Sequence, residues 1–193
     1  WKPVMDHRVT WEDARDHWDY LYDAEALIQL RGNRFHKKKN LLNQFRKLYT
    51  YEYVAFDSTM VGLAMEMQED WCTWRDCESS EALAAENRVI SRVLKQWEGL
   101  TGVVGGALLV DGQMVAYTIG EKLSGDTLVI HFEKGDSQFK GANQAINQMF
   151  LENSGIDASV VNREQDLGDG GLRKAKLSYH PVAFIEKYTV WLK

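Results

Sequence analysis

The sequence predicts an α/β (α+β) fold with a mixed central sheet flanked by helices and a helical N-terminal segment. Helical hydrophobic spacing dominates before residue 98, and apolar strand patterns dominate after Gly99. The chain has 193 residues, 45% of them hydrophobic and 26% charged, which is enough to bury a core. We therefore expect a helix-rich segment over residues 1–98 and a C-terminal domain over residues 99–193.

The residue pattern of the first half of the chain predicts mostly helices. An N-cap signature at Thr10 predicts a short helix near residues 11–18. Alternating aromatic and polar residues predict one strand over residues 50–56. Helical spacing and capping residues predict further helices over 24–30, 37–49, 57–77 and 79–97.

The second half predicts a hairpin followed by alternating strands and helices. Two apolar strands, 103–110 and 114–121, flank Asp111-Gly112, a strong two-residue turn signal. The remaining expected elements are a strand over 127–133, a helix after Phe139, a strand over 158–162, a helix over 172–178 and a strand over 182–192.

The two cysteines, Cys72 and Cys77, lie five residues apart in a predicted helix, which turns them onto different faces. This spacing predicts no disulfide, and hence a reducing, cytoplasmic location. No histidine lies beside them at zinc-ligand spacing, so we expect no metal site. No apolar run approaches the roughly 18 residues that a membrane span needs.

Charge is segregated along the chain. The net charge is −5, yet residues 26–51 contain no acid and seven bases. These bases are Arg31, Arg34, Lys37, Lys38, Lys39, Arg46 and Lys47. Such a cluster is either a patch that binds a phosphate-bearing ligand or a solvated helix face.

The passage from a strand into the helix after Phe139 is one candidate binding site. Free backbone N–H groups at a helix start bind anions. Gln138, Gly141 and Ala142 partly match the glycine-marked pattern of acyltransferases, although Asn143 occupies its last small-residue position. The alternative is an ordinary helix start.

Polar residues at the end of the 158–162 strand form a second candidate site, because open α/β sheets place ligands there. Arg163 and Arg173 are suited to clamp a carboxylate or phosphate, and Glu164 or Asp166 to hold an amine or act as base. Asn162 and Lys174 accompany them. The alternative is a salt-bridged turn.

His36, Tyr179 and His180 are further candidates for proton transfer. The sequence has no Gly-x-Ser-x-Gly, P-loop or HExxH motif and no paired-cysteine motif. The classical serine hydrolase, NTPase and zinc protease classes are therefore excluded.

A family resemblance covers most of the chain, from about residue 19 to about 190. Its segments are Asp19-Tyr-Leu-Tyr22, residues 30–45, Lys140-Gly-Ala-Asn-Gln-Ala-Ile-Asn-Gln148, Val161-Asn-Arg-Glu-Gln-Asp-Leu-Gly168 and Gly171-Leu-Arg-Lys-Ala-Lys-Leu-Ser-Tyr-His-Pro181. Together they resemble the phosphatidylglycerol lysyltransferase C-terminal-like family. The resemblance implies a GNAT-like acyltransferase fold, often present as two tandem domains. Because the chain begins at Trp1 and is short for a tandem, we expect a first GNAT domain to be reduced here or to precede it.

The best-known members of this family transfer an aminoacyl group from aminoacyl-tRNA to a membrane lipid. The resemblance therefore implies an acyl- or aminoacyltransferase with aminoacyl-tRNA or acyl-CoA as donor. Its acceptor would be an amine or hydroxyl of a small molecule, peptide or lipid. Acyl-CoA, held at Gly141, is the one candidate cofactor.

We expect Arg163, Arg173 and Lys174 to bind anionic parts of the substrate, with Glu164, Asp166 and Tyr179 as catalytic candidates. Carrier phosphates would contact the basic stretch at Arg31, Arg34, Lys37 and Lys38. The alternative is a non-catalytic ligand-binding or sensing module on the same fold.

Overall fold

The computed structural model describes residues 8–193, and we refer to this part of the chain throughout. Its main sheet has seven strands in the order β3-β4-β5-β6-β7-β2-β8. They are β2 (Asp19–Asp23), β3 (Tyr51–Ala55), β4 (Val103–Val110), β5 (Gln113–Ser124), β6 (Thr127–Gly135), β7 (Val160–Asn162) and β8 (Ala183–Ile185). Neighbouring strands are antiparallel except β6 and β7, which are parallel.

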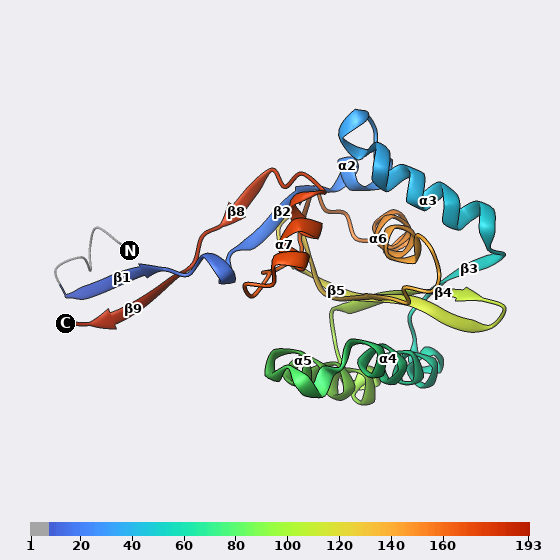
Figure 1. The fold of residues 1–193 in the computed structure, drawn as a ribbon, viewed down its shortest axis with the longest axis horizontal. Helices are drawn as coiled ribbons and strands as arrows, with labels where there is room; N and C mark the ends of the chain where they lie inside the picture. The colour runs from blue at the N-terminus through green and yellow to red at the C-terminus, as the bar shows by residue number, and fades with distance from the viewer. Residues whose placement is uncertain (1–7) are drawn as a thin grey trace.

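Helices cover both faces of this sheet (Figure 1). They are α2 (Ala24–Gln29), α3 (His36–Leu48), α4 (Val61–Arg75), α5 (Glu81–Lys95), α6 (Ala142–Asn153) and α7 (Gly170–Leu177). On one face, α2, α3 and α6 enclose a core that contains Tyr22, Phe45 and Phe150. On the other face, α4 and α5 enclose a second core around Ile90 and Tyr117. The predicted mixed sheet flanked by helices is confirmed, and its order from β4 to β8 is the one expected of a GNAT-like domain.

Most predicted elements are confirmed, but the expected helix near residues 11–18 is wrong. That segment contains β1 (Val9–Asp13) and a single 3-10 turn at Arg15–His17. β1 pairs with the distant β9 (Tyr188–Leu192), and the two form a ribbon that extends from the body (Figure 1). A long-range strand partner thus overrides the local capping signal at Thr10.

The closing strand expected over residues 182–192 is divided into β8 and β9, which pair with β2 and β1, respectively. The sheet also takes strands from both sides of residue 98, because β2 and β3 precede it. A domain boundary at that position stays a prediction. The expectation of a reduced or preceding domain is based on Trp1, which lies outside the described residues.

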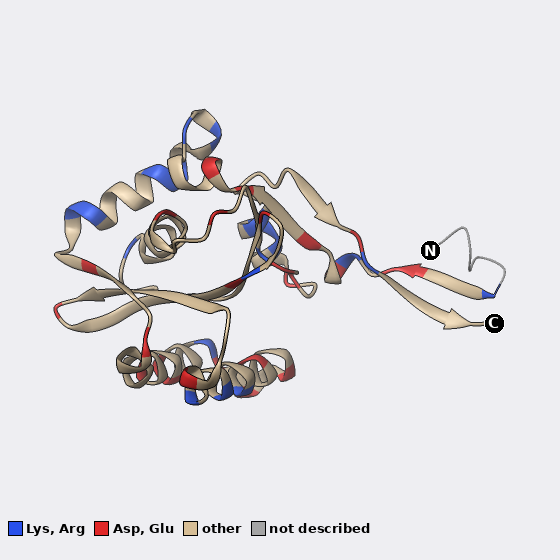
Figure 2. Cartoon of the chain, turned by 180° about the vertical axis from the view of Figure 1, so that it is seen from behind, with Lys and Arg blue, Asp and Glu red and all other residues tan. Residues whose placement is uncertain are grey.

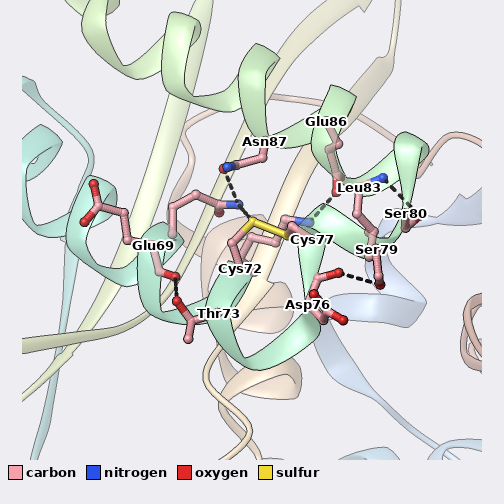
Figure 3. Close-up of a disulfide and its surroundings, with 12 residues drawn as sticks. Glu69, Cys72, Thr73, Asp76, Cys77, Ser79, Ser80, Leu83, Glu86 and Asn87 are labelled. Atoms are coloured by element: carbon pink, nitrogen blue, oxygen red, sulfur yellow. Dashed lines mark hydrogen bonds and ion pairs between the residues drawn. A yellow bond between two sulfur atoms is a disulfide. The ribbon is translucent and has the colours of Figure 1, made fainter.

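The expectation of no disulfide is wrong, because Cys72 and Cys77 are bonded (Figure 3). The helix α4 ends at Arg75, and Asp76 takes a left-handed conformation with φ of 52°. The chain therefore reverses before Cys77, which brings the two Cα atoms to 5.0 Å. An uninterrupted helix cannot make this approach, and the inferred reducing location loses its basis in the cysteines.

Gly141, which precedes α6, packs closely against the backbone of α3. Its φ is +88°, and a Cβ atom placed there would lie 2.2 Å from the backbone oxygen of Leu41. Only glycine satisfies both conditions at this position.

We expect Gly141→Ala to destabilise the fold by about 2–4 kcal/mol in urea unfolding, because it combines left-handed strain with a backbone clash. Gly155→Ala is the matched control: its φ is also positive, at +70°, but no atom lies within 4 Å of the new Cβ. That control should lose only about 1 kcal/mol. Equal losses in the two variants would contradict the close approach of α3.

Candidate functional site

The candidate site lies where β6 and β7 separate. Their parallel pairing runs from Thr127↔Val160 to Val129↔Asn162, where β7 ends while β6 continues to Gly135. A bulge interrupts the pairing of β6 with β5, because Ile119 pairs with Phe132 but Gly120 pairs with Ile130. His131 is the extra residue. Bulges commonly redirect a side chain beside a functional site.

The redirected His131 ring lies between two carboxylates, and we call these three residues the His131 cluster. Its Nδ1 is 2.9 Å from Oε1 of Glu164, and its Nε2 is 3.2 Å from Oε1 of Glu121. The hydrogen bond that the ring donates to Glu164 is the largest cause of a raised His131 pKa. The charge of Glu164 and the hydrogen bond and charge of Glu121 add to it, and together they outweigh burial. All three side chains remain about a third exposed, at 29–35%. The cluster can therefore exchange a proton with a ligand.

Glu164 reaches His131 because the backbone turns sharply there. Its φ is 53°, and its N–H donates to Oδ1 of Asn162 at 2.7 Å. The buried Lys176 ammonium, from α7, donates to the backbone oxygens of both Arg163 and Glu164. Burial, followed by the charge of Arg163, lowers the pKa of Lys176 to about 8. Asn162 and Lys176 thus act as positioning residues for Glu164.

The Arg163 side chain points away from His131 and toward Glu133, Tyr179 and Lys38. We call these four residues the Arg163 cluster. Nη2 of Arg163 bonds Oε1 of Glu133 at 2.7 Å, while its buried Nη1 has no hydrogen-bond partner within the described residues. The guanidinium lies 4.8 Å from the centre of the Tyr179 ring, and the Lys38 ammonium lies 4.1 Å from the same ring. With the Glu133 carboxylate paired to Arg163, the Lys38 ammonium leaves the cluster a net positive charge that favours an anionic ligand.

The acid–base properties of this cluster follow from burial. Burial raises the pKa of Tyr179 to about 12, so its hydroxyl stays protonated and lies against Gln144 and Arg163. Burial, followed by the charge of Arg163, lowers the pKa of Lys38. A bound anion would offset the charge of Lys38, since Glu133 already pairs with Arg163.

Asp166 is held inside the protein by hydrogen bonds. It is 0% exposed and accepts hydrogen bonds from the Tyr20 hydroxyl, the Gly168 N–H and two nitrogens of Arg173. Burial opposes its ionisation, but these bonds outweigh it and hold the pKa of Asp166 below its usual range. Arg173 also bonds Asp16 at 2.6 Å. These contacts are those of a salt-bridged turn, and the catalytic role of Asp166 and the binding role of Arg173 stay predictions.

The remaining basic candidates lie around the Arg163 cluster without joining it. Basic positions follow α3 and the loop before it (Figure 2). Four of these candidates have exposed side chains: Arg31, Arg34, Lys37 and Lys174. Lys38 differs from them, because its ammonium packs on the Tyr179 ring. His36 is also exposed, and Nε2 of His180 lies 3.2 Å from the backbone oxygen of Arg34.

The turn before α6 is covered by neighbouring elements. The N–H of Lys140 donates to the Tyr49 hydroxyl at 3.1 Å, and that of Ala142 donates to the Phe139 oxygen at 3.0 Å. Gly141 packs against the backbone of α3. Gln138 is exposed and lines a cavity beside α4, and neither Gly141 nor Ala142 is among the described residues that line it. These three candidates are not brought together with the His131 cluster.

Sequence reasoning missed His131, Glu121, Glu133 and Lys176. His131 sits between apolar strand residues, and a regular strand would leave it as one more side chain in the alternation. The bulge that exposes it depends on pairing with β5, and no local signal marks it.

The chain matches known proteins over nearly its full length. A family model described as phosphatidylglycerol lysyltransferase, C-terminal, matches residues 3–191. A conserved protein of unknown function from Bacteroides thetaiotaomicron is 36% identical, with a TM-score of 0.93 over 100% of this chain and 65% of that one. An uncharacterized protein of Mycoplasmoides gallisepticum is 25% identical over 173 residues, or 89% of this chain and 55% of that protein.

One further structure shows a likeness of fold alone. It is that of L-PGS from Bacillus licheniformis, which is 12% identical with a TM-score of 0.65, over 97% of this chain and 63% of that one. This chain therefore spans between about half and two thirds of the relatives it matches. Within residues 8–193, no helix is both long and apolar enough to cross a membrane.

We expect Asp166→Asn to lower the free energy of unfolding by about 2–4 kcal/mol, because it leaves Arg173 and Arg15 facing an uncharged group in a buried position. Urea unfolding at neutral pH measures the change. Asp169→Asn, three residues along, is the control: Asp169 caps α7 by accepting from the Leu172 N–H, and asparagine caps equally well. An Asp166→Asn protein as stable as wild type would contradict a structural role.

Proposed function

The chain belongs to the phosphatidylglycerol lysyltransferase C-terminal family, and from this membership we propose that it is an aminoacyl- or acyltransferase whose proton acceptor is the His131 cluster. The observation that carries the proposal is a histidine displaced from its strand by a bulge and held between two carboxylates. The acceptor would be an amine or hydroxyl of a small molecule, peptide or lipid.

The His131 cluster is suited to take a proton. A neutral ring that donates from Nδ1 to Glu164 leaves a lone pair on Nε2, which lies 3.2 Å from the Glu121 carboxylate. A lone pair that faces a negatively charged carboxylate is unfavourable. The Glu121 carboxylate therefore raises the affinity of Nε2 for a proton. An acceptor N–H or O–H that displaces the Glu121 carboxylate from Nε2 would lose its proton there as it attacks the carbonyl carbon of the activated ester.

The Arg163 cluster is suited to hold the donor. Attack on the ester forms an oxyanion and then releases the carrier oxygen, so fixed positive charge and a proton donor help both steps. Arg163 and Lys38 supply charge, and Tyr179 supplies a hydroxyl that stays protonated at neutral pH. The exposed bases Arg31, Arg34 and Lys37 extend this charge outward, where carrier phosphates would lie.

These features favour aminoacyl-tRNA over acyl-CoA as donor. The turn from Gln138 to Ala142, where a pyrophosphate would bind, has the N–H of Lys140 occupied by Tyr49 and its glycine packed on α3. The exposed basic loop instead suits a polyanionic carrier. A tRNA donor would place the activity in the cytoplasm.

A non-catalytic binding module is the second candidate. The cations beside Tyr179 favour it, because Arg163 and Lys38 can hold an anion without any chemical step. The two candidates differ in one measurable property, which is turnover.

We expect the full-length protein to transfer radiolabel from aminoacylated tRNA to an acceptor extract, and His131→Gln to reduce the rate by roughly 100-fold or more. His17→Gln is the matched control, since His17 is exposed in the turn after β1. Its rate should equal that of wild type. A His131→Gln rate within twofold of wild type would contradict the role of the His131 cluster, and tRNA binding without turnover would favour the binding module.

The pH dependence of transfer offers a separate check. His131 must be neutral to accept a proton, so the rate should fall as the pH drops through its raised pKa. We expect Glu164→Gln to move this acid limb to lower pH, because it removes the leading cause of the raised pKa. Glu121→Gln should produce a smaller move in the same direction. An unmoved acid limb in both variants would show that another group titrates.

A further inference from the structure

A cavity of about 780 Å³ lies beside α4, the β4–β5 turn and the loop that leads from β6 to α6. This volume is typical of small-molecule sites. The residues that line it come from three separate parts of the sequence, yet none belongs to the His131 or Arg163 cluster.

The walls of this cavity are acidic. Glu66 and Asp70 lie one turn apart on α4, and Asp136 lies on the loop after β6. No lysine, arginine or histidine is among the described residues that line the cavity. Oδ1 of Asp136 accepts the Gln138 N–H at 2.8 Å, a neutral partner that leaves its charge in place. Within the described residues none of the three carboxylates forms a salt bridge, so together they repel phosphates and attract cations.

Aromatic and apolar side chains lie between these carboxylates. Trp71, Trp74 and Phe139 contribute rings, and Met67 and Met114 contribute apolar surface. Trp71 already binds a cation, since the Lys134 ammonium lies 3.9 Å from its ring centre. Trp74 is 61% exposed, and the Arg75 guanidinium carbon lies 5.8 Å from its ring centre, so this ring also attracts a cation. Exposed tryptophan beside carboxylates is a favourable setting for an ammonium group.

The spread of the carboxylates argues for an extended ligand. Within the described residues they form no group able to hold a single metal ion. A compact cation reaches one wall, whereas several ammonium groups separated by methylenes reach both walls and cover the apolar surface between them. We propose that this cavity binds a linear aliphatic polyamine. The site is independent of the proposed transferase function, because it shares no residue with either cluster.

Isothermal titration of the protein with spermidine tests this proposal. We expect Glu66→Gln/Asp70→Asn to weaken binding about tenfold, since two partly exposed charge pairs are lost. Trp74→Ala should weaken it severalfold by removing the exposed ring. The control is Glu69→Gln, which removes one charge from the same helix outside the cavity and should bind as wild type does. Unchanged melting temperatures without ligand would show that the variants fold.

Three outcomes would overturn the proposal. One is equal spermidine affinity in wild type and both cavity variants. Another is an equal loss in Glu69→Gln, which would indicate attraction by net charge alone. The last is displacement of spermidine by an equal concentration of Mg²⁺, which would indicate binding by charge without a fitted site. Because binding is measured without donor or acceptor, these results do not depend on whether transfer occurs.

Discussion

The site depends on the Lys176 ammonium, which binds the backbone oxygens of Arg163 and Glu164 from beneath the turn after β7. This contact holds a left-handed residue, Glu164, that would otherwise cost strain. With the turn fixed, two adjacent side chains point to different partners, Arg163 to Glu133 and Glu164 to His131. A buried ammonium is costly by itself, and bonds to two carbonyls offset part of that cost. The protein thus uses one buried charge to divide a short segment between two clusters.

The separation of β6 from β7 provides the space for this turn. Parallel pairing ends at Val129↔Asn162, and β6 carries Glu133 onward along the side of α6, where Asn147 donates to it at 2.8 Å. Asp166 then anchors the far end of the loop through Tyr20 and Arg173. Each end of the loop is therefore held by buried hydrogen bonds, which leaves the exposed groups between them in a defined geometry. Preorganisation of this kind is what polar transition states require.

Much of the fold could be predicted because its signals are local. The Asp111-Gly112 turn, the capped helix starts expected near residues 57 and 79 and the amphipathic α3 all appear in the structure. The failures share a physical cause, which is a partner distant in sequence or a single residue with unusual backbone geometry. β1 forms because β9 is available, and the disulfide forms because Asp76 is left-handed. At the site, Arg163 and Glu164 were predictable from their motif, whereas His131 was not, because its bulge exists only in the pairing of β6 with β5.

The charge distribution also acquires a spatial meaning in the fold. A net charge of −5 predicts weak repulsion of nucleic acid by the whole chain. Seven of the bases, however, lie on α3 and the preceding loop, while Glu66, Asp70 and Asp136 lie beside α4 across the sheet. Since screening limits charge effects to about 8–10 Å at physiological salt, each surface acts on its own ligands. A polyanion can therefore approach the α3 side although the total charge is negative, because what it meets is the local charge and not the sum.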